Sequence, residues 1–226
     1  MKNLIGILIV CLTFVGITHA EKISDNMNEV SLSAGITFPQ GTFNRYTDDG
    51  FYAHARFIAH LSSFKAISGF ADLSGSFFKS TEDDVILTNG ILYLDATERI
   101  SEYSVALHLG TMVGSDSRNS FFRPKFGIAG GLYLFNTETL ILNDAISDEP
   151  LAEGNQTQLR VGWRGIVGTD LFFTPQWGLS FEFTYDHVLN LHHFRIVDPA
   201  SQPTTVGQTA RFNNFSIGVI FPLPFD

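Results

Sequence analysis

The sequence predicts an all-β protein: an eight-stranded antiparallel up-and-down β-barrel that spans a membrane. Three observations lead to this fold class. Long segments alternate between apolar and polar residues, the N-terminus carries a signal for export, and no run outside that signal reaches the ~18 apolar residues of a transmembrane helix. In a bilayer every backbone N–H and C=O must find a partner within the protein. An exported membrane protein without a spanning helix is therefore expected to form a closed barrel.

The first twenty residues have the features of a signal peptide. Lys2 supplies a positive charge, residues 4–15 form an apolar segment, and the sequence THA ends at Ala20 with the small-x-small pattern of a cleavage site. We expect cleavage after Ala20. Residues 1–20 are then the signal peptide, and residues 21–226 form a single β-barrel domain.

Composition excludes several classes of protein. Hydrophobic residues make up 44% of the chain and charged residues only 16%, with 20 Gly and 22 Phe, a profile typical of a membrane barrel. The formal net charge of −9 argues against nucleic acid as a partner, because a phosphate-binding surface needs a basic patch. The only cysteine, Cys11, lies within the signal peptide, so the mature chain has no cysteine for a disulfide or a metal.

The clearest strand pattern is a hairpin with arms at residues 159–173 and 179–191, joined by a short turn at 174–178. In each arm apolar residues occupy one face and polar or small residues the other. Both arms reach the ~9–11 residues that a tilted strand needs to cross a bilayer. The apolar face carries Leu159, Val161, Trp163, Val167, Leu171 and Phe173 in the first arm, and Leu179, Phe181, Phe183, Tyr185, Leu189 and Leu191 in the second.

Six further strands follow from the same alternation. Along the third of them, Phe70 and Phe78 fall on the otherwise polar face, which weakens its assignment. Residues 80–101 are interpreted as a long loop with an extramembrane strand extension, because acidic residues surround an apolar core. The predicted strands are 29–38, 50–61, 64–79, 103–113, 121–142 and 211–221.

The predicted connections alternate in length. Those at 39–49, 80–101, 143–157 and 192–210 are long, and those between them are short, as in bacterial outer-membrane barrels. This asymmetry predicts an outer-membrane protein with both termini in the periplasm. A soluble lipocalin-like barrel is the structural alternative, since alternation alone does not say which face is outside. Aromatic residues near the strand ends favour the membrane barrel, where they would form interfacial girdles.

If the apolar face meets lipid, nine charged residues face the lumen. An eight-stranded barrel is just wide enough to be filled by its own side chains, so these charges must largely neutralise one another. Hairpin register places Lys125, Asp170 and Glu182 at one level, and Arg164 near Asp186. The predicted structural lumen network consists of Arg56, Asp72, Arg123, Lys125, Arg160, Arg164, Asp170, Glu182 and Asp186.

The segment RPKFGIAGGLYL at residues 123–134 resembles a Pro-aromatic-Gly-x-x-Gly strand of small outer-membrane barrels, and the mature chain as a whole resembles the OmpA/OmpX-like type. The resemblance implies a monomeric barrel surrounded by outer-membrane lipid and lipopolysaccharide and inserted by the outer-membrane assembly machinery. That machinery usually reads a C-terminal aromatic strand. Here Phe225 is penultimate and Asp226 is last, while Pro222 and Pro224 interrupt pairing just before the end.

Three groups of residues are candidates for chemical sites. His60 and Ser62 have a His-x-Ser spacing similar to that of lipid A deacylases, but they fall at the periplasmic end, away from lipid A. His187 and the pair His192-His193 could bind a metal, although adjacent strand residues point to opposite faces. Acidic segments at 81–84 and 144–153 lack the spacing of a calcium loop.

The sequence therefore predicts neither a catalytic site nor a metal site nor a cofactor. The expected function is that of a non-enzymatic outer-membrane β-barrel with a self-plugged polar lumen, acting through its extracellular loops or as a structural membrane element. A narrow channel for small solutes and a lipid A-modifying enzyme remain as alternatives.

Overall fold

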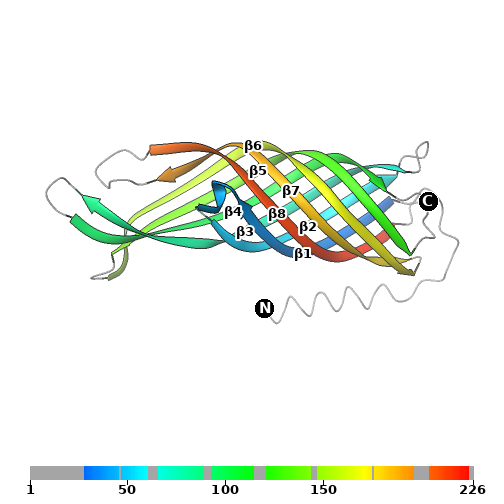
Figure 1. Ribbon diagram of the computed structural model, residues 1–226, viewed down its shortest axis with the longest axis horizontal. Coiled ribbons are helices and arrows are strands. Elements are labelled where there is room, and N and C mark those ends of the chain that lie inside the picture. The colour runs from blue at the N-terminus through cyan, green and yellow to red at the C-terminus, as the bar shows by residue number, and fades with distance from the viewer. Residues whose placement is uncertain are drawn as a thin grey trace.

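The computed structural model describes residues 28–45, 47–60, 66–88, 93–114, 121–143, 147–174, 176–195 and 204–223. Eight strands and one short 3₁₀ helix account for nearly all of them (Figure 1). In chain order they are β1 (Asn28–Gln40), η1 (Phe43–Arg45), β2 (Thr47–His60), β3 (Ile67–Thr88), β4 (Tyr93–Gly114), β5 (Phe122–Asn143), β6 (Ser147–Thr174), β7 (Trp177–Arg195) and β8 (Thr204–Leu223).

The strands form one closed barrel in which every strand pairs antiparallel with its neighbours in sequence, and β8 closes onto β1. The closing pair runs in continuous register from Asn28↔Leu223 to Gln40↔Arg211. This confirms the predicted eight-stranded up-and-down barrel. The expected signal peptide lies outside the described residues, and no helix within the described ranges is long and apolar enough to span a membrane.

One end of the barrel holds Asn28, Leu223 and the strand ends at His60, Gly114 and Thr174; we call it the terminal end. The opposite end holds η1 and the far ends of the strand pairs β3–β4, β5–β6 and β7–β8; we call it the hairpin end. In Figure 1 the three hairpins project past η1 on the left of the view, and the last residues of β8 lie on the right.

The outer surface of the barrel is apolar, as the alternation predicts. Leu109 is 66% exposed and Phe126 is 58% exposed, whereas Arg164, on the other face, is only 1% exposed. Phe70 and Phe78, the two apolar residues on the polar face of β3, are buried in the lumen. The barrel therefore has its charge inside and its hydrocarbon surface outside, the reverse of a soluble lipocalin-like barrel.

The predicted loop boundaries are wrong at the hairpin end. The extramembrane strand extension expected within 80–101 is present and takes up most of that segment, because β3 ends at Thr88 and β4 begins at Tyr93. The loops expected at 143–157 and 192–210 are also largely strand, with β6 beginning at Ser147 and β8 at Thr204. In β3 the acidic residues Glu82, Asp83 and Asp84 pair with residues of β4. Alternation is hard to see here because polar residues are tolerated on both faces of a sheet that rises beyond the apolar belt.

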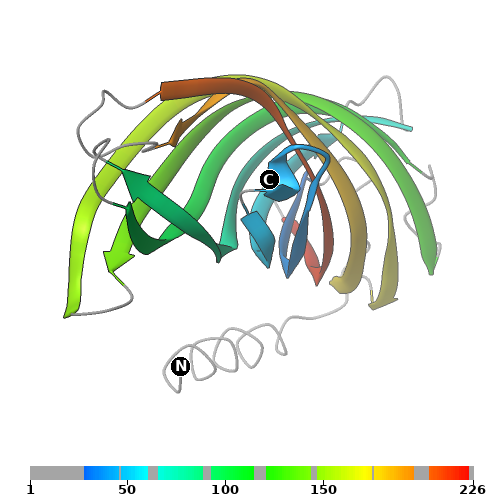
Figure 2. The ribbon, with the colours of Figure 1, turned by 60° about the vertical axis from the view of Figure 1, so that its left-hand side comes forward.

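The hairpin end separates into two parts above the barrel. Toward the hairpin end, the pairing between β6 and β7 stops at Gly162↔Val188. Beyond this pair, β3–β6 continue as one sheet and β7–β8 continue as a separate hairpin. Figure 2 shows the strands fanning out toward this end. Side-chain bonds link the two parts: the amide of Gln158 donates to the carbonyl of His192 and accepts from its N–H at 3.0 Å.

A bulge in β7 reverses the faces near this point. The register with β8 shifts between Val188 and Leu191, and Asn190 has a positive φ of 54°. Leu191, predicted to face lipid with Leu189, is instead fully buried in the lumen, as is Val188. The sequence pattern does not reveal this change because a bulge inserts a residue without altering the local composition.

Candidate functional site: the lumen

The lumen is a filled core with a charged layer between two apolar clusters. At the hairpin end the cluster comprises Phe43, Phe78, Ala106, Tyr133, Phe135, Val188, Leu191, Ala210 and Phe212. At the terminal end it comprises Ile58, Phe70, Met112, Ala129, Ile166 and Ile220, with Phe172 packed against it. Along β3 the inward residues pass in order from Phe70 through Asp72, Ser74 and Ser76 to Phe78, which spans all three layers.

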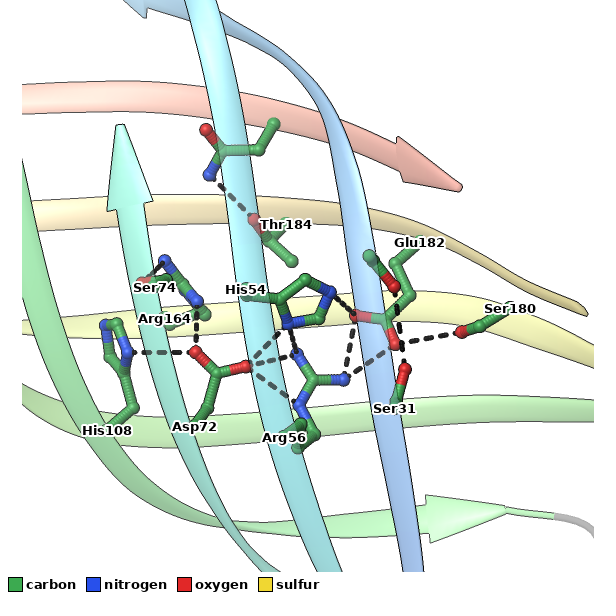
Figure 3. A network of polar contacts seen from close by, with 12 residues as sticks. Ser31, His54, Arg56, Asp72, Ser74, His108, Arg164, Ser180, Glu182 and Thr184 are labelled. Atoms are coloured by element: carbon green, nitrogen blue, oxygen red, sulfur yellow. Dashed lines mark hydrogen bonds and ion pairs between the residues drawn. The ribbon is translucent and has the colours of Figure 1, made fainter. Parts of the chain in front are cut away.

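Arg56 lies at the centre of the charged layer (Figure 3). Its Nη1 donates to both carboxylate oxygens of Glu182 at 2.7 Å, and its Nε donates to Asp72 at 3.0 Å. Arg56 is on β2 and Glu182 on β7, two strands that are separated in the barrel wall by β1 and β8. The ion pair thus crosses the lumen from wall to wall.

Arg164 extends this layer toward the hairpin end. Its Nη1 donates to Asp72 at 2.8 Å and to the Tyr52 hydroxyl at 2.9 Å, and its Nε donates to Asp186 at 2.9 Å. Asp186 also accepts from the Tyr133 hydroxyl at 2.5 Å and from the Asn214 amide at 2.7 Å. Each charged group therefore has several partners, which a fully buried charge requires.

Lys125 extends the layer in the opposite direction. Its Nζ lies 2.7 Å from Asp170 and 2.6 Å from Glu182, and donates to Ser180 at 2.8 Å. It therefore separates two carboxylates that would otherwise repel each other. The result is a chain of alternating sign across the barrel: Asp170, Lys125, Glu182, Arg56, Asp72, Arg164, Asp186.

Two histidines lie against this chain. His54 Nδ1 is 2.8 Å from Asp72 and its Nε2 is 3.7 Å from Glu182, while His108 lies 3.4 Å from Asp72 and 3.6 Å from Asp186. Each histidine thus stands beside the same two carboxylates that an arginine bridges. The chain has four carboxylates and three basic groups, and the two histidine rings are packed beside it.

Two glycines make room for this packing. His108, Gly131 and Gly162 pair across β4, β5 and β6. A Cβ at Gly131 would lie 2.4 Å from the His108 ring, and one at Gly162 would lie 2.8 Å from the Tyr133 ring. Gly131 of the 123–134 segment and Gly162 of β6 therefore accommodate the buried rings of His108 and Tyr133, which contact the charged layer.

Seven of the nine residues predicted for the lumen network are brought together in the central chain, and two are elsewhere. Arg123 lies at the terminal end, where it donates to Glu29 at 2.9 Å. Arg160 is at the hairpin end, half-buried, and contacts Gln158 at 2.7 Å and His192 at 2.8 Å. The predicted balance of five cations against four anions therefore does not describe one connected cluster.

Sequence reasoning gave no role to several residues of the network: Glu29, Tyr52, His54, His108, Tyr133 and Asn214. The alternation within each strand does place them on the inward face. What the pattern could not supply was the pairing across the lumen, because register fixes only neighbours within the wall.

An aromatic lid covers the charged layer at the hairpin end. Phe43 of η1 is fully buried and makes edge-to-face contacts with Phe78 at 5.2 Å and Phe135 at 6.2 Å between ring centroids. Thr47 holds the turn by donating to the Phe43 carbonyl at 3.1 Å. The connection between β1 and β2 was predicted only as a loop, yet it folds one phenylalanine into the barrel mouth.

The described residues of the other candidate sites have other partners. His60 contacts Ser68 at 2.8 Å, and Ser62 lies outside the described residues. His187 stacks on Trp163 at 5.6 Å on the outer surface, whereas His192 contacts Arg160; the His193 side chain is not described. Within the described ranges no group of three or more His, Cys, Asp or Glu is arranged to hold a metal ion.

A closed eight-stranded antiparallel barrel with an apolar outer surface and a packed polar lumen is the architecture of small outer-membrane β-barrel proteins. The structure is similar to that of Neisserial surface protein A, with 14% identity and a TM-score of 0.53 over 90% of this chain and 100% of that one. It is also similar to a major outer membrane protein from Thermus thermophilus, with 11% identity and a TM-score of 0.51 over 87% of this chain and 99% of that one.

These similarities establish the fold. No protein-family model matches the sequence, and no curated protein matches it.

Proposed function

We propose that the protein is a non-enzymatic barrel of the outer membrane whose lumen is plugged by its own side chains. It acts through its hairpin end or as a structural element of the membrane. The ion pairs across the lumen are the observation that supports this proposal. Arg56 and Arg164 link opposite walls through Glu182, Asp72 and Asp186, and each of these five residues is at most 1% exposed.

The outer surface supports a position in a bilayer. Every strand carries large apolar side chains on its outward face between the terminal end and the base of the hairpins. A soluble protein would present polar groups there. Trp163 and Tyr185 contact each other on this surface toward the hairpin end, as Phe173 and Trp177 do at the terminal end. Such aromatic pairs suit the two interfaces of a membrane.

The proposal includes an orientation in the membrane. With the signal peptide removed after Ala20, the terminal end faces the periplasm and the hairpin end faces outward. The surroundings are outer-membrane lipid and lipopolysaccharide, insertion depends on the outer-membrane assembly machinery, and the barrel functions as a monomer. Glu82, Asp83 and Asp84 then belong to the exposed outer surface available to partners.

Two measurements test the proposal. Cell fractionation with heat-modifiable gel mobility should find a folded barrel in the outer membrane; recovery from the soluble fraction would refute that position. In planar bilayers the purified protein should show no conductance above background. Conductance well above background would instead favour a small-solute channel, and altered lipid A acylation on expression would favour an enzyme.

A further inference from the structure

Three polar side chains lie side by side on the outer surface, where its apolar part stops toward the hairpin end. They are His187 of β7, Arg211 of β8 and Gln40 of β1, which pair in one continuous row across the three strands. Gln40 and Arg211 are exposed, and His187 is half-buried. Directly paired residues have Cβ atoms about 4.5–5.5 Å apart, so a small group bound at Arg211 can reach the neighbour on either side.

The row lies where the barrel surface changes from apolar to polar. Along the outward face of β8, Ile217 and Phe215 are large exposed apolar residues, and this apolar run ends before Arg211. On the β6 side, Trp163 pairs with His187, and the two rings stack at 5.6 Å between centroids. Exposed tryptophan and arginine side chains at such a boundary lie at the level of the lipid headgroups.

Arg211 has no carboxylate from its own or the adjacent strands beside it on the outer surface. The described parts of β1, β7 and β8 contain three acidic residues, Glu29, Glu182 and Asp186, and all three are buried in the lumen. The side chains of Gln40 and His187 add hydrogen-bond donors next to the guanidinium without adding negative charge. The row therefore presents a positive charge, without an acidic neighbour in these strands, to an anionic lipid surface.

The geometry and the charge favour a phosphate monoester. Such a group bears close to two negative charges at neutral pH, whereas the phosphate diester of a phospholipid bears one. An arginine fork can hold two phosphate oxygens at once, and an adjacent side chain can donate to the third.

We propose that Arg211, assisted by His187 and Gln40, binds a phosphate of lipid A in the outer leaflet. The proposal rests on the orientation given under the proposed function, in which the hairpin end faces outward and the lipid beside this row is lipopolysaccharide.

Native mass spectrometry of the whole folded barrel, released from detergent micelles, tests this inference. Lipid A with its phosphates, the same lipid A without them, and phosphatidylglycerol are titrated separately, and the bound fraction of each is measured. Phosphorylated lipid A should bind at least about tenfold more tightly than the dephosphorylated form, the effect of one charge-assisted hydrogen bond. Phosphatidylglycerol should fall between the two, because its phosphate carries a single charge.

Arg211→Gln should remove most of the preference for the phosphorylated lipid A and leave the affinity for the dephosphorylated form unchanged. Arg211→Lys keeps the charge but loses the fork, so it should retain only part of the preference. Arg99→Gln is the matched control, because Arg99 is exposed and already paired with Glu82; it should leave all three affinities unchanged. Heat-modifiable gel mobility verifies that each variant is folded.

Three results would overturn the inference: equal binding of the two forms of lipid A by the wild-type protein, an unchanged preference in Arg211→Gln, or an equal loss in Arg99→Gln. Equal affinities for phosphorylated lipid A and phosphatidylglycerol would assign the row to phospholipid and would overturn it as well. These measurements use purified protein and do not depend on its location in the cell. Recovery from the soluble fraction would instead refute the proposed position in the membrane.

Discussion

Arg56 and Glu182 lie 126 positions apart in the sequence and join opposite walls of the barrel through two hydrogen bonds of 2.7 Å from a single nitrogen. Their strands, β2 and β7, come within reach only because β8 closes onto β1. The contact is therefore a property of the closed barrel and not of any hairpin.

Replacing Arg56 should be severe. Arg56→Gln removes the partner that Glu182 and Asp72 share, and breaking a buried ion pair typically costs about 3–5 kcal/mol. Urea unfolding in lipid or detergent measures this loss. The control is Arg99→Gln, whose pair with Glu82 is exposed and worth no more than about 1 kcal/mol. Similar losses in the two variants would contradict the buried network as a source of stability.

Two adjacent glycines should respond differently to the same change. Gly131→Ala would place a Cβ 2.4 Å from His108, whose ring is already packed edge-to-face on Tyr133, and overpacking of this kind costs about 1–3 kcal/mol. Gly130→Ala meets nothing within 4 Å and should be close to neutral. Thermal unfolding of both variants provides the measurement, and adding His108→Ala to Gly131→Ala should recover stability. A loss that persists in this double variant would place the strain elsewhere.

Removing the aromatic lid should destabilise the barrel without opening it. Phe43→Ala deletes a fully buried ring, a change that costs about 3–5 kcal/mol in a protein core, whereas Phe43→Leu should retain most of the packing. Planar-bilayer recordings of Phe43→Ala should stay at background, because the chain around Arg56 and Arg164 still crosses the lumen. An open channel in this variant would show that the lid alone is the barrier.

The bulge in β7 predicts a conformational effect. Asn190 has a φ of 54°, a left-handed conformation that costs roughly 1–2 kcal/mol for most residues and nothing for glycine. Asn190→Gly should therefore leave the melting temperature unchanged or higher. Asn190→Val should lower it and weaken the burial of Leu191, which hydrogen exchange at the β7–β8 hairpin would report. Equal tolerance of both substitutions would argue against the bulge.

Much of the fold could be predicted from the sequence, for a physical reason. A strand with lipid on one side and a packed lumen on the other must alternate, so strand number, antiparallel order and faces follow from the pattern of residues such as Leu107, His108 and Leu109. Above the apolar belt both faces meet water. There the constraint disappears, and the pattern predicts a loop at 143–157, where β6 already begins at Ser147.

The lumen was less predictable. Neighbouring contacts such as Arg164 with Asp186 follow from strand register, because the two residues pair directly across β6 and β7. The contact of Arg56 with Glu182 depends on barrel diameter and side-chain length. The lid formed by Phe43 depends on the path of a short connection, which no periodic pattern encodes.

The closing register between β1 and β8 ends at Gln40↔Arg211, and that between β2 and β3 ends at Thr47↔Ser80. Beyond this level no described strand pairs with residues 82–88 of β3 on the side away from β4. Within the closed barrel, the described strands leave no free edge to which a strand of a second chain could pair. At the hairpin end, the edge of β3 presents unpaired main-chain N–H and C=O groups. Three consecutive exposed acids, Glu82, Asp83 and Asp84, stand at this border, where basic residues of an incoming strand would complement them.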